Sequence, residues 1–158
     1  MNHQSKCFID LKEASLEEIN SLKRPFTFTN GVFDILHLGH AEYLANSKQL
    51  NGSLIVGVNS DISTKLLGKG PNRPINNEDD RARLLSSIKC VDAVIIFDDS
   101  CPLSLISLLK PEFYTKGGDY DLNNIPESKL VKELGGEIIK SEFKRGYSSS
   151  DVIKKASK

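Results

Sequence analysis

The sequence is short of several features that mark specialised classes of protein. It has three cysteines, Cys7, Cys90 and Cys101, without C-x-x-C spacing, which argues against a disulfide framework or a zinc site. Its formal net charge is zero, whereas a protein that coats nucleic acid usually carries a basic excess. No apolar run approaches the roughly 18–20 residues that cross a bilayer, and the first residues lack the apolar core of a secretion signal. We therefore expect a soluble cytoplasmic protein with neither nucleic-acid nor membrane partners.

The 158 residues suffice for one domain with its own core, built from alternating strands and helices. Short apolar stretches separated by helical patterns predict strands at 26–29, 53–59, 92–97, 112–115 and 137–140. The nearly unbroken apolar run at 53–59 is typical of a strand buried on both faces. We therefore predict an α/β, Rossmann-like fold, in which five parallel strands form a sheet with helices on both faces. Helical spacing at 10–24 assigns residues 1–24 to a helical N-terminal extension, before a domain at 25–158.

The stretch TNGVFDILHLGH, residues 29–40, holds two of the three histidines. Gly31 allows a sharp turn after the first strand, and a helix is expected to begin near Gly39, where free backbone N–H groups attract anions. His37 and His40 would lie beside such an anion as hydrogen-bond donors. Taken alone, such a pair is more often a core histidine or a solvated helix start. A metal site is disfavoured because no further ligand stands at a useful spacing.

Ligands of parallel sheets bind where the carboxyl ends of the strands gather. Other loops at this edge also carry polar residues, so they are candidates for the same site. The loop after the second strand supplies Asp61, Lys65, Lys69 and Arg73, and Arg81 follows on the next helix. Each of these could be an ordinary solvated side chain. Together they indicate a site for a charged ligand.

Two further segments strengthen this interpretation. KGGDY, which begins at Lys116, places two glycines after a strand, where backbone can approach a flat ligand or simply turn. Ser148, Ser149 and Ser150 stand at the start of the last helix, where an N-cap needs only one hydroxyl. The remaining hydroxyls and N–H groups could hold the outer phosphates of a nucleotide.

At this point the chain resembles a known family. GVFDILHLGH and SSSDVIKK are similar to the two signatures of the HxGH nucleotidyltransferases, which are cytidylyltransferase-like. Within that superfamily, RPIN, KGGDYD and IPES make the chain resemble the stand-alone bacterial D-glycero-β-D-manno-heptose 1-phosphate adenylyltransferases. The resemblance covers about residues 25–155.

The resemblance implies that ATP and heptose 1-phosphate give ADP-heptose and pyrophosphate, for lipopolysaccharide or another surface glycan. It implies that His37, His40 and Arg81 are catalytic and contact phosphates, and that Mg²⁺ bridges the ATP phosphates without a protein metal site. The implied nucleotide-binding residues are Asn30, Gly31, Val32, Phe33, Gly39, His40, Gly117, Gly118, Asp119, Ser148, Ser149 and Ser150. The candidates for sugar-phosphate binding are Asp61, Lys65, Arg73 and Lys116. Relatives are often dimers or higher, so we expect a homo-oligomer.

The chain departs from the family pattern in its last helix, where Lys154 and Lys155 replace a common arginine and a bidentate fork is lost. The residues do not decide between ATP and CTP from first principles, because backbone groups often read the base. One alternative is therefore a cytidylyltransferase acting on glycerol 3-phosphate or another polyol phosphate. The other is a nucleotide-binding module that has lost catalysis.

Overall fold

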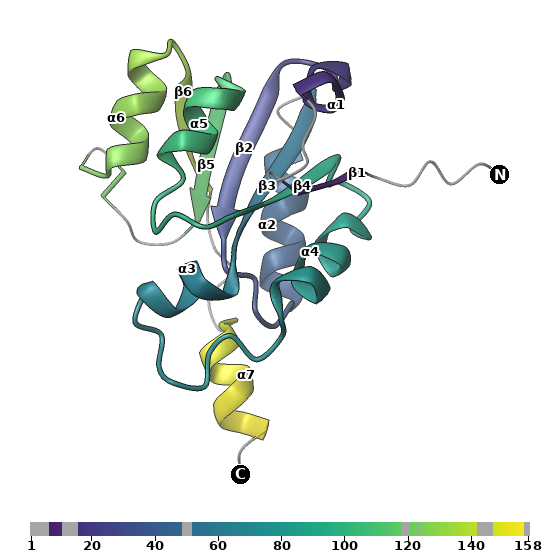
Figure 1. The fold of residues 1–158 in the computed structure, drawn as a ribbon, viewed down its shortest axis with the longest axis vertical. Helices are drawn as coiled ribbons and strands as arrows, with labels where there is room; N and C mark the ends of the chain where they lie inside the picture. Colours follow the sequence, from purple (N-terminus) through teal and green to yellow (C-terminus); the bar gives the residue numbers. More distant parts are fainter. Residues whose placement is uncertain are drawn as a thin grey trace, which may run out of the picture.

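The fold is built on one parallel sheet. A computed structural model describes residues 7–10, 16–48, 52–117, 121–122, 124–141 and 147–156. Within these residues, six strands pair in the order β1-β4-β3-β2-β5-β6 (Figure 1). The strands are β1 (Cys7–Asp10), β2 (Phe26–Gly31), β3 (Ser53–Asn59), β4 (Ala93–Phe97), β5 (Phe113–Gly117) and β6 (Glu137–Ser141). The five predicted strands correspond to β2–β6, and the predicted Rossmann-like α/β class is confirmed.

The helices connect these strands. They are α1 (Leu16–Ser21), α2 (Leu38–Lys48), α3 (Asp61–Leu66), α4 (Glu78–Ser86), α5 (Leu103–Leu109), α6 (Pro126–Glu133) and α7 (Ser149–Ala156). Side-chain caps begin several of them: for example, Ser60 accepts from Ser63 N at the start of α3, and Asn77 accepts from Asp80 N at the start of α4. In the part of the chain that the structure describes, no helix is long and apolar enough to span a membrane.

The N-terminal segment differs from its predicted helical character. Residues 7–10 form β1, which pairs in parallel with β4 and sets Cys7 opposite Ala93. Of the helix predicted at 10–24, Leu16–Ser21 form α1, and residues 11–15 lie outside the described residues. Four residues of strand are too few to show a period of two, and their pairing partner lies more than 80 residues along the chain. The sixth strand therefore extends the sheet at an edge that the sequence pattern did not reveal.

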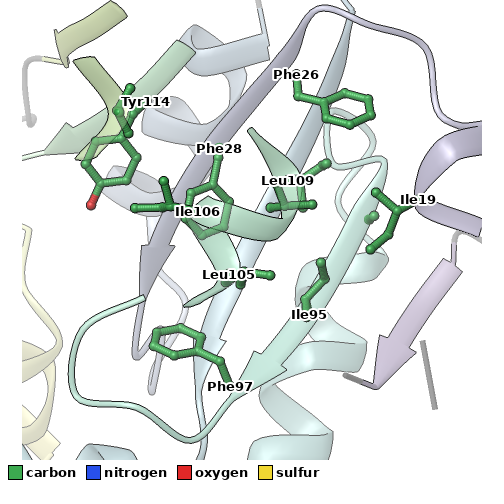
Figure 2. Close-up of a cluster of buried hydrophobic side chains, with 12 residues drawn as sticks. Ile19, Phe26, Phe28, Ile95, Phe97, Leu105, Ile106, Leu109 and Tyr114 are labelled. Atoms are coloured by element: carbon green, nitrogen blue, oxygen red, sulfur yellow. The ribbon is translucent and has the colours of Figure 1, made fainter. Parts of the chain in front are cut away.

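Both faces of the sheet are buried, each by its own hydrophobic cluster. On one face, side chains from β2, β4 and β5 pack against α1, α5 and α6, and Figure 2 shows Phe28, Ile95 and Ile106 among the labelled side chains of this cluster. On the other face, α2 and α4 cover residues of β3 and β4 such as Val56 and Val94. Neighbouring residues of one strand point to opposite faces, which explains why the central strands are apolar throughout.

A crevice opens between β2 and β5. From β2 the chain runs outward through β3 to β4, crosses back to β5 and continues to β6. The β2–β3 ladder continues as far as Gly31 opposite Val58, whereas β2 and β5 pair only at Thr27–Phe113 and Phe28–Tyr114. The two strands thus separate before their carboxyl ends. This is the switch point of the sheet, where open parallel sheets bind their ligands.

Candidate active site

A cavity of about 760 Å³ lies at this carboxyl edge. Its walls come from the ends of β2 and β5 and from the starts of α2, α6 and α7, and Figure 1 shows α3 and α7 beyond the arrowhead of β2. The predicted site residues that line it are Asn30, Gly31, Val32, Phe33, His37, His40, Arg73, Lys116, Gly117, Ser148, Ser149 and Ser150. The volume suits a small-molecule site, for which roughly 300–1,000 Å³ is typical.

Other predicted residues lie elsewhere. Gly39, Asp61, Lys65 and Arg81 do not line the cavity, and Gly118 and Asp119 fall outside the described residues. Lys69, named only among the polar residues of its loop, also lines the cavity. Conversely, the cavity is lined by residues that the sequence did not single out: Asp34, Tyr43, Asn59, Leu67, Ser100, Glu127 and Tyr147.

The two histidines form a stacked pair at the start of α2. Their ring centroids are 3.8 Å apart and their planes differ by 17°. The backbone N–H of His40 donates to the carbonyl of His37 at 3.0 Å and makes a longer contact of 3.4 Å with His37 Nδ1. Because Nδ1 accepts, a neutral His37 ring carries its proton on Nε2. That N–H is then available to donate to a ligand.

Both imidazoles favour the neutral form. Burial lowers the pKa of His40 to about 4, the charges of His37 and Lys69 contribute to the shift, and a hydrogen bond with the Ile35 backbone opposes it. Burial also lowers the pKa of His37. At neutral pH the pair therefore offers neutral N–H donors, and an arriving anion would raise both pKa values.

Gly39 lies against the histidine pair and leaves room for its neighbours His37 and Tyr147. It is buried, and a Cβ at this position would lie 3.0 Å from Tyr147 Cβ and 3.1 Å from His37 Nδ1. A side chain would push away either the histidine ring or the segment that leads into α7. The glycine thus lets three cavity elements pack closely, although it does not line the cavity itself.

The backbone between β2 and α2 is strained at Phe33, a non-glycine residue with φ of 49°. Left-handed backbone is uncommon for a bulky side chain and is concentrated at functional sites. The Phe33 ring packs 5.2 Å from the His40 ring, centroid to centroid. The loop is therefore held in a defined conformation against the histidine pair.

The three serines at the start of α7 have different partners. Ser148 Oγ accepts from Asp151 N at 3.0 Å and is the N-cap. Ser149 Oγ donates to the Ile35 carbonyl at 3.1 Å, which ties α7 to the β2–α2 loop. Ser150 is exposed and also lines the cavity. The start of α7 thus presents a hydroxyl and backbone N–H groups to the cavity.

Arg81 does not fit the predicted phosphate contact. Its side chain is fully buried, and its guanidinium donates to the carbonyls of Val32 and Asn59 at 2.7 Å each and of Asn76 at 2.9 Å. A fourth bond of 2.7 Å reaches Asp61 Oδ1, and Asp61 itself does not line the cavity. With four bonds inside the protein and no exposed surface, Arg81 connects loops beneath the cavity instead of facing a ligand.

Asp34 organises the loop that follows α3. Its buried carboxylate accepts from Arg73 Nε at 2.5 Å, Ile75 N at 2.8 Å and Asn76 N at 2.9 Å. Burial alone would raise the pKa of Asp34, but the bonds from Asn76, Ile75 and Arg73 bring it below its usual value. The charge of Arg73 is therefore neutralised within the protein. Asp34 stands in GVFD and Arg73 in RPIN, but nothing in the sequence paired these two segments with each other.

Lys69, in the same loop, differs from Arg73 in that no described carboxylate forms an ion pair with it. Its side chain lines the cavity, and none of the described carboxylates lies within ion-pair distance of it. Burial and the nearby Arg73 lower its pKa, which Asp34 partly offsets. The GKG sequence around Lys69 placed it in a loop at the sheet edge, but nothing in the sequence distinguished it from Lys65. Lys65 is an exposed residue of α3.

The wall formed by β5 and α6 carries a salt bridge. Lys116 Nζ lies 2.8 Å from Glu127 Oε1, and the carboxylate side chain is only 7% exposed. Burial raises the pKa of the Cys101 thiol to about 11, together with the charge of Glu127 and a hydrogen bond to it. Glu127 stands in IPES, but nothing in the sequence paired it with Lys116, because the two residues lie on different elements.

The described residues contain no cluster of three or more His, Cys, Asp or Glu side chains that could hold a metal ion. The two cavity carboxylates are both engaged, Asp34 with Arg73 and two backbone N–H groups, and Glu127 with Lys116. This donor set does not fit a metal bound directly by the protein, since Mg²⁺ usually takes one or two carboxylates besides phosphates.

Comparison with known proteins places this architecture in context. A family model described as cytidylyltransferase-like matches residues 28–155. The chain is 48% identical over 134 residues to a D-beta-D-heptose 1-phosphate adenylyltransferase from Bordetella bronchiseptica, covering 85% of this chain and 83% of that protein. It is also 48% identical over 143 residues to the bifunctional protein HldE of Helicobacter pylori. That match covers 90% of this chain and 30% of HldE, so the chain spans less than a third of the bifunctional protein.

A solved structure also matches the fold. The lipopolysaccharide core biosynthesis protein from Thermoplasma volcanium superposes with a TM-score of 0.62 at 32% sequence identity. The match covers 78% of this chain and 98% of that one.

Proposed function

The chain belongs to the cytidylyltransferase-like family, and from this membership we propose that it transfers AMP from ATP to D-glycero-β-D-manno-heptose 1-phosphate. The products are ADP-heptose, for lipopolysaccharide or another surface glycan, and pyrophosphate. The observation that carries the proposal is the 48% identity to a heptose 1-phosphate adenylyltransferase over 83% of that enzyme. A cavity that gathers neutral and cationic donors at the switch point of the sheet supports it.

The reaction needs no covalent intermediate. An oxygen of the sugar phosphate attacks the α-phosphorus of ATP in line, and pyrophosphate leaves on the opposite side. The Cys101 thiol is hydrogen-bonded to the cavity residue Glu127 and is unsuited as a nucleophile, because its pKa is raised to about 11. The rate must therefore come from positioning and from stabilisation of the developing charge.

We assign the stabilisation of that charge to donors of α2, α7 and the loop after α3. His37 and His40 start as neutral donors, and a phosphoryl group beside them raises their pKa as its charge grows. Ser150 and the N–H groups at the start of α7 face the same cavity and suit the outer phosphates. Lys69 supplies a fixed positive charge, while Arg73 is already paired with Asp34.

Mg²⁺ is the expected partner of the ATP phosphates, where it would neutralise charge on the leaving pyrophosphate. Because Asp34 and Glu127 are both engaged, the ion would be carried by phosphate oxygens and water. We therefore derive no step through a metal held by the protein. A cytoplasmic location and a homo-oligomeric state stay predictions.

The substrate assignment is tested by measuring pyrophosphate release with ATP or CTP, each against heptose 1-phosphate or glycerol 3-phosphate. We expect turnover with ATP and heptose 1-phosphate. Turnover with CTP and glycerol 3-phosphate alone would overturn the heptose assignment and favour the polyol phosphate alternative.

The same assay separates an enzyme from a nucleotide-binding module that has lost catalysis. We expect His40→Ala to lower kcat by roughly 10²–10³, the usual cost of removing one transition-state donor. Its KM for ATP should change far less, because the backbone and the α7 donors remain. A near-normal kcat in this variant would mean that the imidazole has only a structural role.

A further inference from the structure

The cavity has two chemically different walls. α2, which carries His40, packs on the sheet face formed by residues such as Leu54 and Val56. α6, which carries Glu127, packs on the opposite face through Val131 and Leu130. The histidines and Glu127 therefore approach the crevice from opposite sides of the sheet, and both line it.

The α6 wall presents a donor and an acceptor side by side, with no net charge. Lys116 Nζ and Glu127 Oε1 are 2.8 Å apart, and both side chains are mostly buried, at 20% and 7% exposed. Burial alone would raise the pKa of Glu127, but the hydrogen bond from Lys116 and further bonds lower it, so the carboxylate stays ionised. An ammonium so closely paired has little attraction left for a phosphate, and the carboxylate repels one.

Asn30 adds a second donor on the other side of the crevice. Its Oδ1 accepts from Tyr114 Oη at 2.7 Å, so its amide NH₂ is the part left to donate. Asn30 and Lys116 stand near the ends of β2 and β5, beyond the last pair that joins these strands. Amide, ammonium and carboxylate thus border the point where the strands have separated.

We propose that Lys116 and Glu127, facing Asn30, form a hydroxyl-binding site that takes a vicinal diol of a sugar ring. Each hydroxyl both donates and accepts, so two neighbouring hydroxyls match an ammonium and a carboxylate held side by side. The inference rests on the proposed function, which brings two sugars to the cavity: the ribose of ATP and the heptose. Glu127 is the specificity-determining residue, and Cys101, which donates to it, is a positioning residue.

The test is Glu127→Gln, which keeps the shape of the side chain and removes its charge. Loss of a hydrogen bond to a charged acceptor is expected to raise the KM of the sugar substrate roughly 10- to 100-fold, with kcat changed less than about threefold. If the pair instead bound a phosphate, removing the carboxylate would strengthen the attraction and lower that KM. A raised KM therefore indicates hydroxyl binding, and a lowered KM indicates phosphate binding.

Two arms identify which sugar is bound. For the ribose, wild type should bind 2′-deoxy-ATP and 3′-deoxy-ATP more weakly than ATP in calorimetric titrations, and Glu127→Gln should lose this discrimination. For the heptose, the variant should raise the KM of heptose 1-phosphate and leave that of ATP unchanged. A Glu127→Gln enzyme with both KM values and the deoxy-ATP discrimination unchanged, or with a lower KM, overturns the proposal.

Two controls keep the result interpretable. Glu112→Gln removes the charge of a carboxylate that pairs with Arg24 at 2.7 Å and does not line the cavity, so it should leave all kinetic constants unchanged. Thermal unfolding of both variants separates a folding defect from a lost contact. Wild-type pyrophosphate release with heptose 1-phosphate is measured first, because its absence would sink the proposed function alone. In that case the ATP and deoxy-ATP titrations decide the hydroxyl site by themselves. Equal discrimination between ATP and deoxy-ATP by wild type and Glu127→Gln would overturn it.

Discussion

Lys65 and Lys69 stand four residues apart and differ in what they can reach. Both side chains are exposed, but Lys69 lines the cavity without a paired carboxylate among the described residues, whereas Lys65 lies on α3 outside the cavity. We expect Lys69→Met to lower kcat/KM roughly 10- to 100-fold, as a charge-assisted phosphate contact is lost. Lys65→Met is the matched control and should stay within about twofold. Equal losses in steady-state assays of the two variants would contradict the assignment.

His40 also makes stability depend on pH. Its folded-state pKa of about 4 lies below the usual 6.5, so the unfolded chain takes up a proton over this interval while the folded protein does not. The contribution of neutral His40 to the free energy of unfolding is therefore fully present above pH 6.5 and is lost as the pH falls toward 4. Between pH 7.5 and 5 the loss should be about 2 kcal/mol.

Urea unfolding at the two pH values measures this effect. His40→Asn removes the titrating group, so the variant should lose about 2 kcal/mol less than wild type between pH 7.5 and 5. Asp34, Glu112 and Glu127 have lowered pKa values and contribute mainly below this range. Parallel losses in the two proteins would show that His40 is not held neutral by burial.

At the scale of the elements, Arg81 holds together the segments that form the cavity floor. Its guanidinium joins α4 to the end of β2, the end of β3 and the loop before α4 through Val32, Asn59 and Asn76. We expect Arg81→Met to lower the free energy of unfolding by about 3–5 kcal/mol, because buried acceptors lose their partner. Arg83→Met, at an exposed position of the same helix, should change it by less than about 0.5 kcal/mol in urea unfolding. Similar values for the two variants would rule out the proposed role.

The sequence predicted the features that are encoded in continuous segments of the chain and missed those that depend on contacts between distant segments. The apolar runs of β2–β6 and the HxGH segment are continuous in the chain, so period and spacing predicted them. β1 and α3 have only four and six residues and were missed. The bonds Asp34–Arg73 and Lys116–Glu127 join different elements, and the burial of Arg81 depends on three loops meeting. Such contacts have no local pattern, so the sequence could not show that Arg81 is buried, and its phosphate role came from the family resemblance alone.

At the scale of the whole molecule, β1 protects an edge of the sheet. It pairs with β4, and every cavity-lining residue that the structure describes follows it, from Asn30 onward. Removing residues 1–14 should therefore leave kcat/KM within about threefold and expose β4 as an edge strand that promotes aggregation. Light scattering at rising protein concentration, beside the kinetic assay, tests both parts. A soluble but inactive truncated protein would show that the N-terminal segment contributes to the site.

The separation of β2 and β5 also makes this enzyme a candidate for engineering. Because Asn30 and Lys116 stand beyond the last residue pair that joins β2 and β5, they can be exchanged without changing that pairing. A library confined to Asn30, Lys116 and Glu127 would alter the wall opposite the histidines and leave the donors of α2 and α7 in place. Such variants offer a route to nucleotide-activated sugars that the parent protein does not make.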